Sequence, residues 1–217
     1  MVRYPSWYLQ RWHFLPEGYL SRRSAGGYEG VVRRVYNAGR ERLVLARLAD
    51  AIEEQAPASV TELGCGPGRA LAELSRRLPE ASLTGIDLSP FMLERAERRL
   101  ATPGRHIDLV HGSGTEVPLP DASTDAVVAV HFIGHLPRAA ADRAWLEAVR
   151  LLVPGGRLYV VDHAWHPRGA TDLALRSRTS LLTGILRFSI FEKQTQHGSV
   201  APVHTGGQTS VFRSTYL

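Results

Sequence analysis

The sequence predicts an α/β domain built on a doubly wound, mostly parallel sheet. Short apolar segments alternate with amphipathic segments of helical length, a pattern that is typical of βαβ units. The first of these apolar segments runs into a glycine-rich loop, Glu62–Gly68, and a helical segment follows it. The segment Asp125–His131 is rich in valine and apolar, which indicates a central strand buried on both faces.

Length and composition indicate one domain with an appendage, since the chain has 217 residues. Hydrophobic residues make up 44% of it, but no apolar run approaches the ~20 residues that cross a bilayer. The N-terminus carries no apolar signal segment, so we expect a soluble, cytoplasmic protein without a membrane span. Cys65 is the one cysteine, which excludes an internal disulfide and supplies no metal cluster, so no metal site is expected. The oligomeric state is left open.

The chain is basic, with a net charge of +5 and a pI near 9.8. Lys193 is the only lysine, and the arginines lie among acidic residues in a sequence rich in alanine, glycine and leucine. Glu94 and Arg98, for example, are spaced to pair on one exposed helix face. We therefore interpret the charge as a compositional bias and expect no nucleic-acid partner.

The chain divides into an N-terminal arm and a sheet domain. Residues 1–29 are aromatic and irregular, and a helical period follows over residues 30–54. We expect residues 1–54 to form an aromatic and helical lid, and residues 55–217 to form the sheet domain. Within that domain, residues 170–217 have no clear period.

The first half of the sheet domain shows two strands, each followed by a helix. Ser59–Leu63 is a short apolar strand, and Arg69–Leu78 carries three leucines on one helical face. Ser82–Asp87 is the second strand. Ser89 is a suitable N-cap, with proline directly after it, for a helix that ends at Leu100.

The second half continues the alternation. His106–His111 and Asp125–His131 are the third and fourth strands. Arg138–Leu152 has the period of a helix and stops at Pro154–Gly156, and Arg157–Asp162 is the fifth strand.

Beyond the fifth strand the pattern is weaker. Thr171–Ile185 could be a helix, and Phe188 with Ile190 could belong to a strand. Val211–Tyr216 could be another strand, after a polar tract at Gln194–Gln208. Whether this region completes the sheet is left open.

The glycine loop is suited to a nucleoside ligand. Side chains at Gly64, Gly66 or Gly68 would block a molecule lying across the loop. A glycine loop alone could be a tight turn, but here Asp87 ends the next strand, where an acid suits the hydroxyls of a ribose. The combination predicts a nucleoside cofactor.

The identity of that cofactor follows from spacing and charge. The loop reads G-x-G-x-G, whereas the dinucleotide fingerprint is G-x-G-x-x-G. Glu62 precedes the glycines, and its carboxylate would repel a pyrophosphate but not the cationic methionine end of S-adenosyl-L-methionine. These features favour S-adenosyl-L-methionine over NAD or NADP.

From Ser59 to about His163 the sequence resembles the class I S-adenosylmethionine-dependent methyltransferases, in particular the group that methylates quinones, sterols and natural products. The motifs that carry the resemblance are Glu62–Gly68, Gly85–Ser89, Pro118–Asp125 and Leu152–Gly156. The resemblance implies a Rossmann-like methyltransferase fold, with Leu88 against the adenine and His131 near the methionine portion. The usual adenine-binding acid is replaced, because Gly112–Gly114 reads Gly-Ser-Gly. The candidate cofactor-binding residues are Glu62, Gly64, Cys65, Gly66, Gly68, Asp87, Leu88, Ser113, Gly114 and His131.

Histidines gather after the last two parallel strands. His131 and His135 follow the fourth strand, and His163 and His166 follow the fifth. Each one alone could be an ordinary loop residue or a cofactor contact. As a group they could deprotonate a phenol, an enol or an ammonium near neutral pH, so His131, His135 and His163 are the candidate catalytic residues.

The expected function is methyl transfer to an O, N or C nucleophile of a small-molecule acceptor, with the aromatic arm as a lid or as a strap packed on the sheet. A cofactor-binding regulatory or scaffold protein without turnover remains an alternative. A nucleic-acid base methyltransferase is disfavoured, because Val130–His135 lacks a Pro-Pro-aromatic motif. The acceptor, the methylated atom and the use of a general base are left open.

Overall fold

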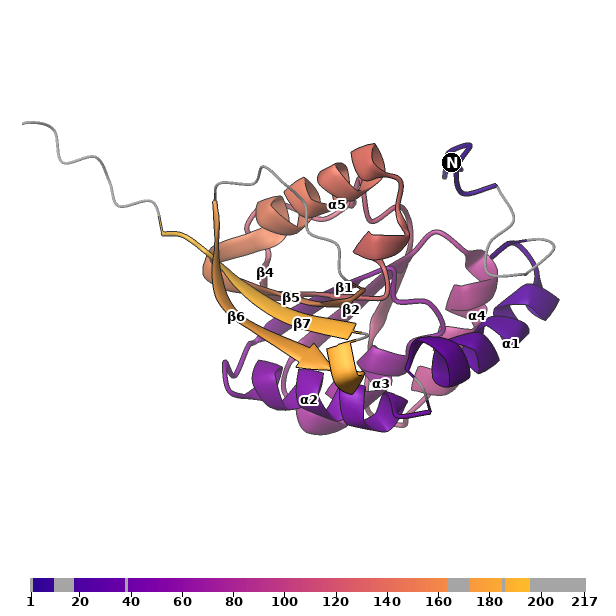
Figure 1. Ribbon diagram of the computed structural model, residues 1–217, viewed down its shortest axis with the longest axis horizontal. Coiled ribbons are helices and arrows are strands. Elements are labelled where there is room, and N and C mark those ends of the chain that lie inside the picture. The colour runs from indigo at the N-terminus through magenta and orange to yellow at the C-terminus, as the bar shows by residue number, and fades with distance from the viewer. Residues whose placement is uncertain (1, 10–17, 38, 164–171, 185, 196–217) are drawn as a thin grey trace, which may run out of the picture.

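In the described part of the chain, the strands form one seven-stranded sheet with the order β3-β2-β1-β4-β5-β7-β6 (Figure 1). This computed structural model describes residues 2–9, 18–37, 39–163, 172–184 and 186–195. The strands are β1 (Ser59–Leu63), β2 (Ser82–Asp87), β3 (Asp108–His111), β4 (Thr124–Val130), β5 (Leu152–Asp162), β6 (Leu173–Leu181) and β7 (Leu186–Lys193).

The first five strands are parallel, and their order reverses between β1 and β4. β1 pairs with β2 on one side and with β4 on the other. β3 lies outside β2 and β5 lies outside β4, both in parallel register. This arrangement confirms the predicted doubly wound sheet, in which ligands bind beyond the carboxyl ends of the strands at the point of reversal.

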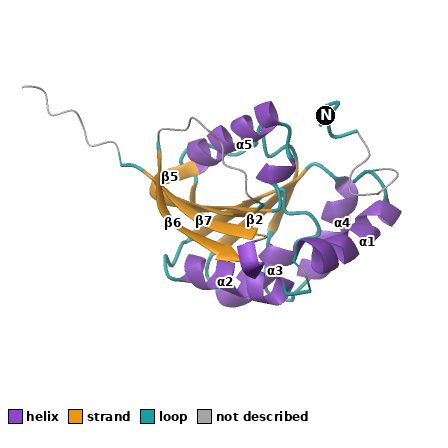
Figure 2. Cartoon of the chain, viewed as in Figure 1, coloured by secondary structure: helices purple, strands orange, loops and turns teal. Residues whose placement is uncertain are grey.

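Helices cover both faces of the sheet. Figure 2 shows α5 on one face, and α2 and α3 on the opposite face. The helices are α1 (Arg22–Val31), α2 (Glu41–Glu53), α3 (Arg69–Arg77), α4 (Pro90–Leu100) and α5 (Arg138–Leu151), with a π-helical turn at Val32–Tyr36 and 3-10 turns at Ile133–His135 and Leu182–Gly184. The predicted cap of α4 is confirmed, since Oγ of Ser89 accepts a hydrogen bond from Met92 N at 3.2 Å.

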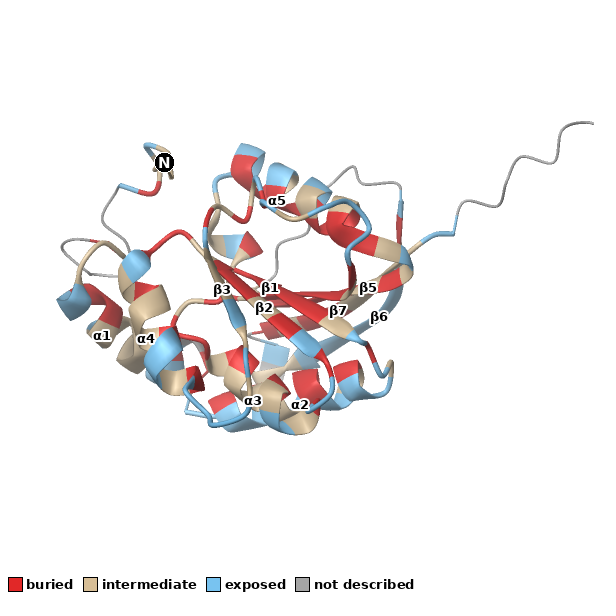
Figure 3. Cartoon of the chain, turned by 180° about the vertical axis from the view of Figure 1, so that it is seen from behind, coloured by how far each residue is buried: buried red, intermediate tan, exposed pale blue. Residues whose placement is uncertain are grey.

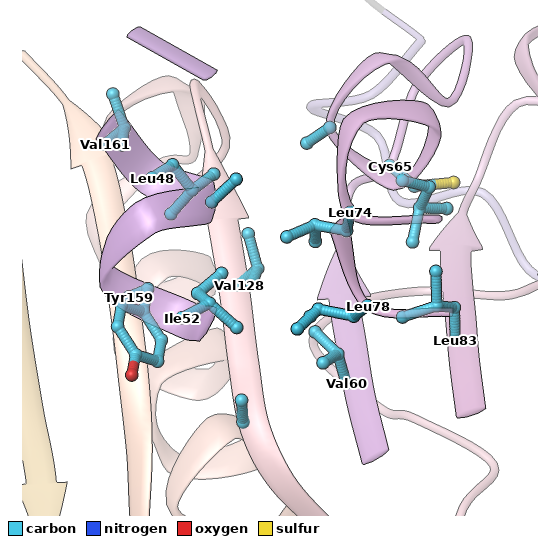
Figure 4. Close-up of a cluster of buried hydrophobic side chains, with 14 of the residues drawn as sticks. Leu48, Ile52, Val60, Cys65, Leu74, Leu78, Leu83, Val128, Tyr159 and Val161 are labelled. Atoms are coloured by element: carbon cyan, nitrogen blue, oxygen red, sulfur yellow. The ribbon is translucent and has the colours of Figure 1, made fainter. Parts of the chain in front are cut away.

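Each face of the sheet carries its own apolar core. On one face, Leu48 and Ile52 of α2 pack beside Val128 and Tyr159, as Figure 4 shows. On the other face, Trp145 of α5 lies in the second buried cluster, with strand and turn residues around it. Figure 3 shows that the central strands between these layers are largely buried, which explains their near-continuous apolar sequences.

The N-terminal region is more regular than the sequence predicted. Residues 22–31 form helix α1, capped by Oγ of Ser21, which accepts from Ser24 N at 3.1 Å. The single helical segment expected over residues 30–54 is instead divided, because the chain turns at Gly39, whose φ is 75°. The expectation of an irregular arm up to residue 29 is therefore wrong in its last part.

Charge pairing explains why α1 forms there. Glu29 near the end of α1 pairs with Arg95 and Arg99 of α4, each at 2.9 Å. These contacts hold the helix against the sheet domain, and tertiary contacts of this kind stabilise a short helix that its own sequence would not.

The C-terminal region completes the sheet with an antiparallel hairpin. The strand expected around Phe188 and Ile190 is confirmed as β7, which pairs antiparallel with β5. The helix expected over Thr171–Ile185 is wrong: this segment contains β6, which pairs with β7 along its whole length. The helix was predicted wrongly because β6 is an edge strand with mostly exposed side chains, so its sequence lacks the alternation of apolar and polar residues that marks a strand. Val211–Tyr216 lies outside the described residues.

The boundaries of the other strands differ slightly from the predicted ones. β5 begins at Leu152, five residues before the expected Arg157, and its pairing with β4 shifts register between Thr124 and Ala126. The predicted turn at Pro154–Gly156 therefore lies within the irregular first part of β5, where Gly155 adopts a φ of 79°. β3 begins at Asp108, two residues after the expected His106. No helix in the described residues is long and apolar enough to cross a membrane.

Candidate active site

The glycine loop follows β1 directly and leads into α3. Gly64, Gly66 and Gly68 all have positive φ, at 67°, 52° and 74°. A Cβ at Gly64 would lie 2.3 Å from the Phe132 ring, whereas a Cβ at Gly66 would meet nothing within 4 Å. The loop therefore needs glycine for its backbone path, and at Gly66 the space in front of it is open.

Cys65 has a packing role inside this loop. Its side chain is buried, and a Cβ at Gly85 of β2 would lie 2.9 Å from its Sγ. Burial and the nearby charge of Asp87 raise the pKa of the thiol well above its usual value, so the sulfur stays protonated and unreactive.

Asp87 ties the glycine loop to the end of β2. Its Oδ2 accepts a hydrogen bond from Gly66 N and its Oδ1 accepts one from Ser89 N, both at 2.8 Å. Burial raises the pKa of this carboxyl to about 6, while the hydrogen bonds from Ser89 and Gly66 act in the opposite direction. Each oxygen has further lone-pair capacity, so the carboxylate can also accept from the hydroxyls of a ligand.

A cavity of about 710 Å³, open to solvent, lies in front of this loop and carboxylate. It holds many of the residues expected to bind a cofactor. Those residues are Gly64, Gly66, Asp87, Leu88, Ser113, Gly114 and His131. Gly68 does not line it: this residue caps α3, and a Cβ there would lie 3.0 Å from Ala96.

A second cavity of about 460 Å³ lies behind the glycine loop and shares Gly64, Gly66, Tyr28 and His131 with the first. Glu62 lines it, is 2% exposed, and has no hydrogen-bond partner for Oε2 among the described residues. Burial and the charge of Asp87 raise the pKa of Glu62 well above its usual value. A buried acceptor without a partner suits a cationic ligand group, so the residues fit the methionine end of S-adenosylmethionine.

Ser113 stands where a carboxylate was expected by resemblance. Its Oγ lies 2.8 Å from Oγ1 of Thr115 and accepts a hydrogen bond from Thr115 N at 3.2 Å. Thr115 also lines the main cavity. A pair of hydroxyls, rather than a carboxylate, thus faces the space beside Leu88.

The described part of the N-terminal arm forms one wall of the main cavity, through Trp7, Tyr8, Tyr19 and Tyr28. The ring centroids of Tyr8 and Tyr19 are 5.8 Å apart, and those of Tyr19 and Tyr28 are 5.4 Å apart. Ser89 Oγ donates to the carbonyl oxygen of Tyr19 at 2.5 Å. The arm therefore sits directly on the loop that follows Asp87.

Three histidines meet at the carboxyl ends of β4 and β5. The ring centroid of His163 lies 5.9 Å from that of His131 and 6.3 Å from that of His135. His131 has a φ of 49°, and its Nε2 lies 2.9 Å from Oδ1 of Asn37. His131 and His135 line the main cavity, whereas His163 is not among its lining residues. His166 lies outside the described residues.

Burial makes two of these histidines weak bases. It lowers the pKa of His131 to about 3, with further lowering from His135 and His163. It lowers the pKa of His135 to about 4, with a contribution from His163. Both rings are therefore uncharged at pH 7, well away from the titration near neutral pH that the sequence suggested.

Asp162 has a local structural role. Its Oδ2 accepts from Gly134 N at 2.6 Å, and its Oδ1 accepts from His163 N at 2.8 Å. The carboxylate thus shapes the turn after β4 through backbone groups.

Sequence reasoning missed several lining residues. Phe132 packs against both Gly64 and Gly114, and a Cβ at Gly114 would lie 2.6 Å from its ring. Phe132 and Leu136 follow β4, so their position beyond a parallel strand was an available signal. Asn37 lines the second cavity but comes from outside the sheet domain, and no motif marks it.

The comparisons with known proteins agree with this geometry. A family model described as a methyltransferase domain matches residues 60–156. The demethylmenaquinone methyltransferase of Thermus thermophilus is 31% identical over 146 residues, which cover 67% of this chain and 66% of that protein. The phthiotriol/phenolphthiotriol dimycocerosates methyltransferase of Mycobacterium leprae is 36% identical over 106 residues, covering 48% of this chain and 37% of that protein. The chain thus spans less than two thirds of either relative.

A solved structure shares the fold. The N-methyltransferase NodS from Bradyrhizobium japonicum, in complex with S-adenosyl-L-homocysteine, superimposes with a TM-score of 0.59 and 20% sequence identity, covering 75% of this chain and 90% of that one. At this level of identity the likeness supports the architecture. Because the family model spans β1 to the start of β5, and the loop after β1 meets its acidic partner at the end of β2, residues 60–156 form a methyltransferase domain of the class I S-adenosylmethionine-dependent type.

Proposed function

We propose that this protein transfers a methyl group from S-adenosyl-L-methionine to a small-molecule acceptor. The observation that carries the proposal is the position of Asp87, hydrogen-bonded to the glycine loop and facing the main cavity. The buried, unpartnered oxygen of Glu62 on the other side of the loop supports it. When bound, the cofactor supplies a methyl group that is already activated as a sulfonium.

Each part of the cofactor has matching residues. Asp87 would accept hydrogen bonds from the ribose hydroxyls, and Leu88 would pack against the adenine beside Ser113. Gly64 and Gly66 would allow close approach of the ligand to the backbone. Glu62 would accept from the ammonium group.

The acceptor would lie between the arm and the end of β4. Trp7 and Tyr8 of the arm and Phe132 and Leu136 after β4 give this end of the main cavity aromatic and apolar walls. Such walls suit an apolar organic molecule, and the names of the two methyltransferase relatives also point to small-molecule acceptors. We propose that residues 1–54 act as the lid on this pocket.

The remaining task of the protein is to align the acceptor and exclude water, since proximity can supply ~7–11 kcal/mol of the barrier. His131 and His135 would contact the acceptor as neutral hydrogen-bonding groups, because their lowered pKa values disfavour taking a proton at neutral pH. His163, whose ring lies near both of theirs, would help to hold them in place. An acceptor that reaches the site already deprotonated, or with an acidic proton, suits this pocket best.

A transfer assay tests the proposal. The protein is incubated with S-adenosyl-L-methionine labelled in its methyl group and with separate panels of phenols, quinols, amines, carboxylic acids, RNA and DNA. We expect label in at least one small-molecule product and none in nucleic acid, and Asp87→Ala should lower the signal at least about tenfold at cofactor concentrations below saturation. Label in RNA or DNA alone would support a base methyltransferase, whereas cofactor binding without transfer to any acceptor would support a regulatory role.

A further inference from the structure

Two residues that line the second cavity each have a buried side-chain atom without a partner among the described residues, and the two atoms are of opposite kind. One is the acceptor Oε2 of Glu62, and the other is the donor Nε of Arg69. Both residues line the cavity, Glu62 from the end of β1 and Arg69 from the first position of α3. Buried polar atoms in proteins are nearly always paired, so two such atoms in one cavity indicate a ligand with both a donor and an acceptor.

The position of this cavity restricts the part of the ligand that it can take. It shares Gly64, Gly66, Tyr28 and His131 with the main cavity, so the two spaces meet across the glycine loop. Asp87 lines the main cavity but not the second one. With the adenosine at Asp87, the part of the cofactor beyond the sulfur would reach the cavity that Glu62 and Arg69 line.

The charge around Arg69 allows a further carboxylate. Arg69 pairs with Glu29 at 3.5 Å and with Glu41. Glu29 is shared with Arg95 and Arg99. Arg69, Arg95 and Arg99 therefore share the carboxylate of Glu29, and Arg69 also meets that of Glu41. Because Arg69 also begins α3, the positive end of that helix adds to the attraction for an anion.

We infer that Arg69 binds the carboxylate of the cofactor's methionine portion, while Glu62 receives its ammonium group. Glu29 of α1 and Glu41 of α2 pair with the terminal nitrogens of the guanidinium, and Nε keeps no partner among the described residues. The N-terminal helices thus contribute to cofactor binding through Arg69. This inference rests on the proposed function, and it names the residue that distinguishes the intact cofactor from analogues without a carboxylate.

Three ligands separate the roles of the two residues. S-adenosyl-L-homocysteine carries both the carboxylate and the ammonium group, its decarboxylated analogue keeps only the ammonium group, and 5′-methylthioadenosine has neither. Their affinities for the full chain are measured by calorimetry. Arg69→Gln should lower the affinity for S-adenosyl-L-homocysteine by about ten- to a hundredfold, as expected for a lost charge-assisted hydrogen bond, and change the other two within about twofold. Glu62→Gln should weaken the first two ligands and leave 5′-methylthioadenosine unchanged.

The matched control is Arg76→Gln, because Arg76 lies on the exposed side of the same helix and pairs with Glu73. It should leave all three affinities unchanged. If Arg69→Gln weakens all three ligands equally, or none, the inference is wrong. If the Arg69→Gln variant does not fold, the wild-type protein still decides: equal affinity for S-adenosyl-L-homocysteine and its decarboxylated analogue would overturn the role of Arg69. If the wild type binds none of the three ligands, both the proposed function and the inference about Arg69 are wrong.

Discussion

Nε2 of His131 lies 2.9 Å from Oδ1 of Asn37, and this buried contact joins the end of β4 to the turn before α2. An amide oxygen only accepts, so Nε2 of His131 carries the proton. The bond fixes the orientation of a histidine that lines both cavities, and it links the N-terminal helices to the sheet at the site itself.

Replacing Asn37 by Ala should reduce stability. The change leaves the buried N–H of His131 without its acceptor, at a cost of ~1–3 kcal/mol. Urea denaturation monitored by circular dichroism measures this loss. Arg34→Ala, an exposed position in the preceding π-helical turn, is the control and should change stability little. Equal stability of both variants would mean that the His131–Asn37 bond contributes nothing.

The arm should matter more for the acceptor than for the cofactor. Deleting residues 1–20 removes Trp7, Tyr8 and Tyr19 from the cavity wall, while the glycine loop and Asp87 remain. We expect methyl transfer to be abolished and the affinity for S-adenosyl-L-homocysteine to change only several-fold. Leu9→Ala, at an arm residue that is 59% exposed, should retain transfer. Normal turnover by the truncated protein would rule out a lid, and unfolding would identify the arm as a structural strap.

The parallel half of the fold could be predicted because its signals are local. β1, the glycine loop and β2 lie where the sequence placed them, since apolar runs bounded by Gly and Asp mark buried strands. β6 could not be predicted, because its pairing with β7 decides its structure and its own residues are mostly exposed. α1 depends likewise on Glu29 reaching Arg95 and Arg99, partners far away in the sequence.

The same holds for the site: residues marked by local motifs could be predicted, and residues placed by tertiary packing could not. Glycine spacing and an acid after the next strand were sufficient to place Gly66 beside Asp87, which the structure joins by a hydrogen bond. Asn37 and Arg69 could not be found this way, because their position beside Glu62 depends on how α2 and α3 pack. The lowered pKa values of His131 and His135 were also out of reach, since burial sets them.

Cofactor affinity should depend on pH through Asp87, whose pKa is raised to about 6 by burial. Protonation removes acceptor capacity, so the dissociation constant for S-adenosyl-L-homocysteine should rise as the pH falls through 6, by up to ~10-fold per pH unit. Titrations from pH 5 to 8 measure this. Asp87→Ala should lower the affinity at least about tenfold at pH 8 and flatten the profile. A wild-type profile that is flat over this range would contradict an essential Asp87 carboxylate.

Stability of the free protein should follow the opposite trend. The folded-state pKa of Asp87 lies above its ordinary value of 3.8, so the folded state binds the proton more tightly than the unfolded state. The contribution of Asp87 to the free energy of unfolding is thus fully present below pH 3.8 and is lost as the pH rises through 6. Comparing wild type and Asp87→Ala by urea denaturation at pH 5 and pH 8 measures it. A difference between the variants that does not change with pH would contradict the shift.

The C-terminal hairpin should contribute strongly to stability through Phe191. Its ring meets Trp145 of α5 edge-on, with centroids 4.8 Å apart, and it is 8% exposed. Phe191→Ala should cost ~3–5 kcal/mol in urea denaturation, because a large buried ring leaves a cavity. Leu175→Ala on the exposed face of β6 is the control and should cost far less. Similar losses for both would show that β7 does not anchor the hairpin to the core.

The central claim is that the loop Glu62–Gly68 and Asp87 bind S-adenosylmethionine rather than a dinucleotide. Calorimetric titration of the full chain with S-adenosyl-L-homocysteine, NAD and NADP tests it most directly. We expect one S-adenosyl-L-homocysteine to bind per chain. Neither dinucleotide should bind, because the carboxylate of Glu62 beside the loop would repel a pyrophosphate. Binding of NAD or NADP with no binding of S-adenosyl-L-homocysteine would contradict the account.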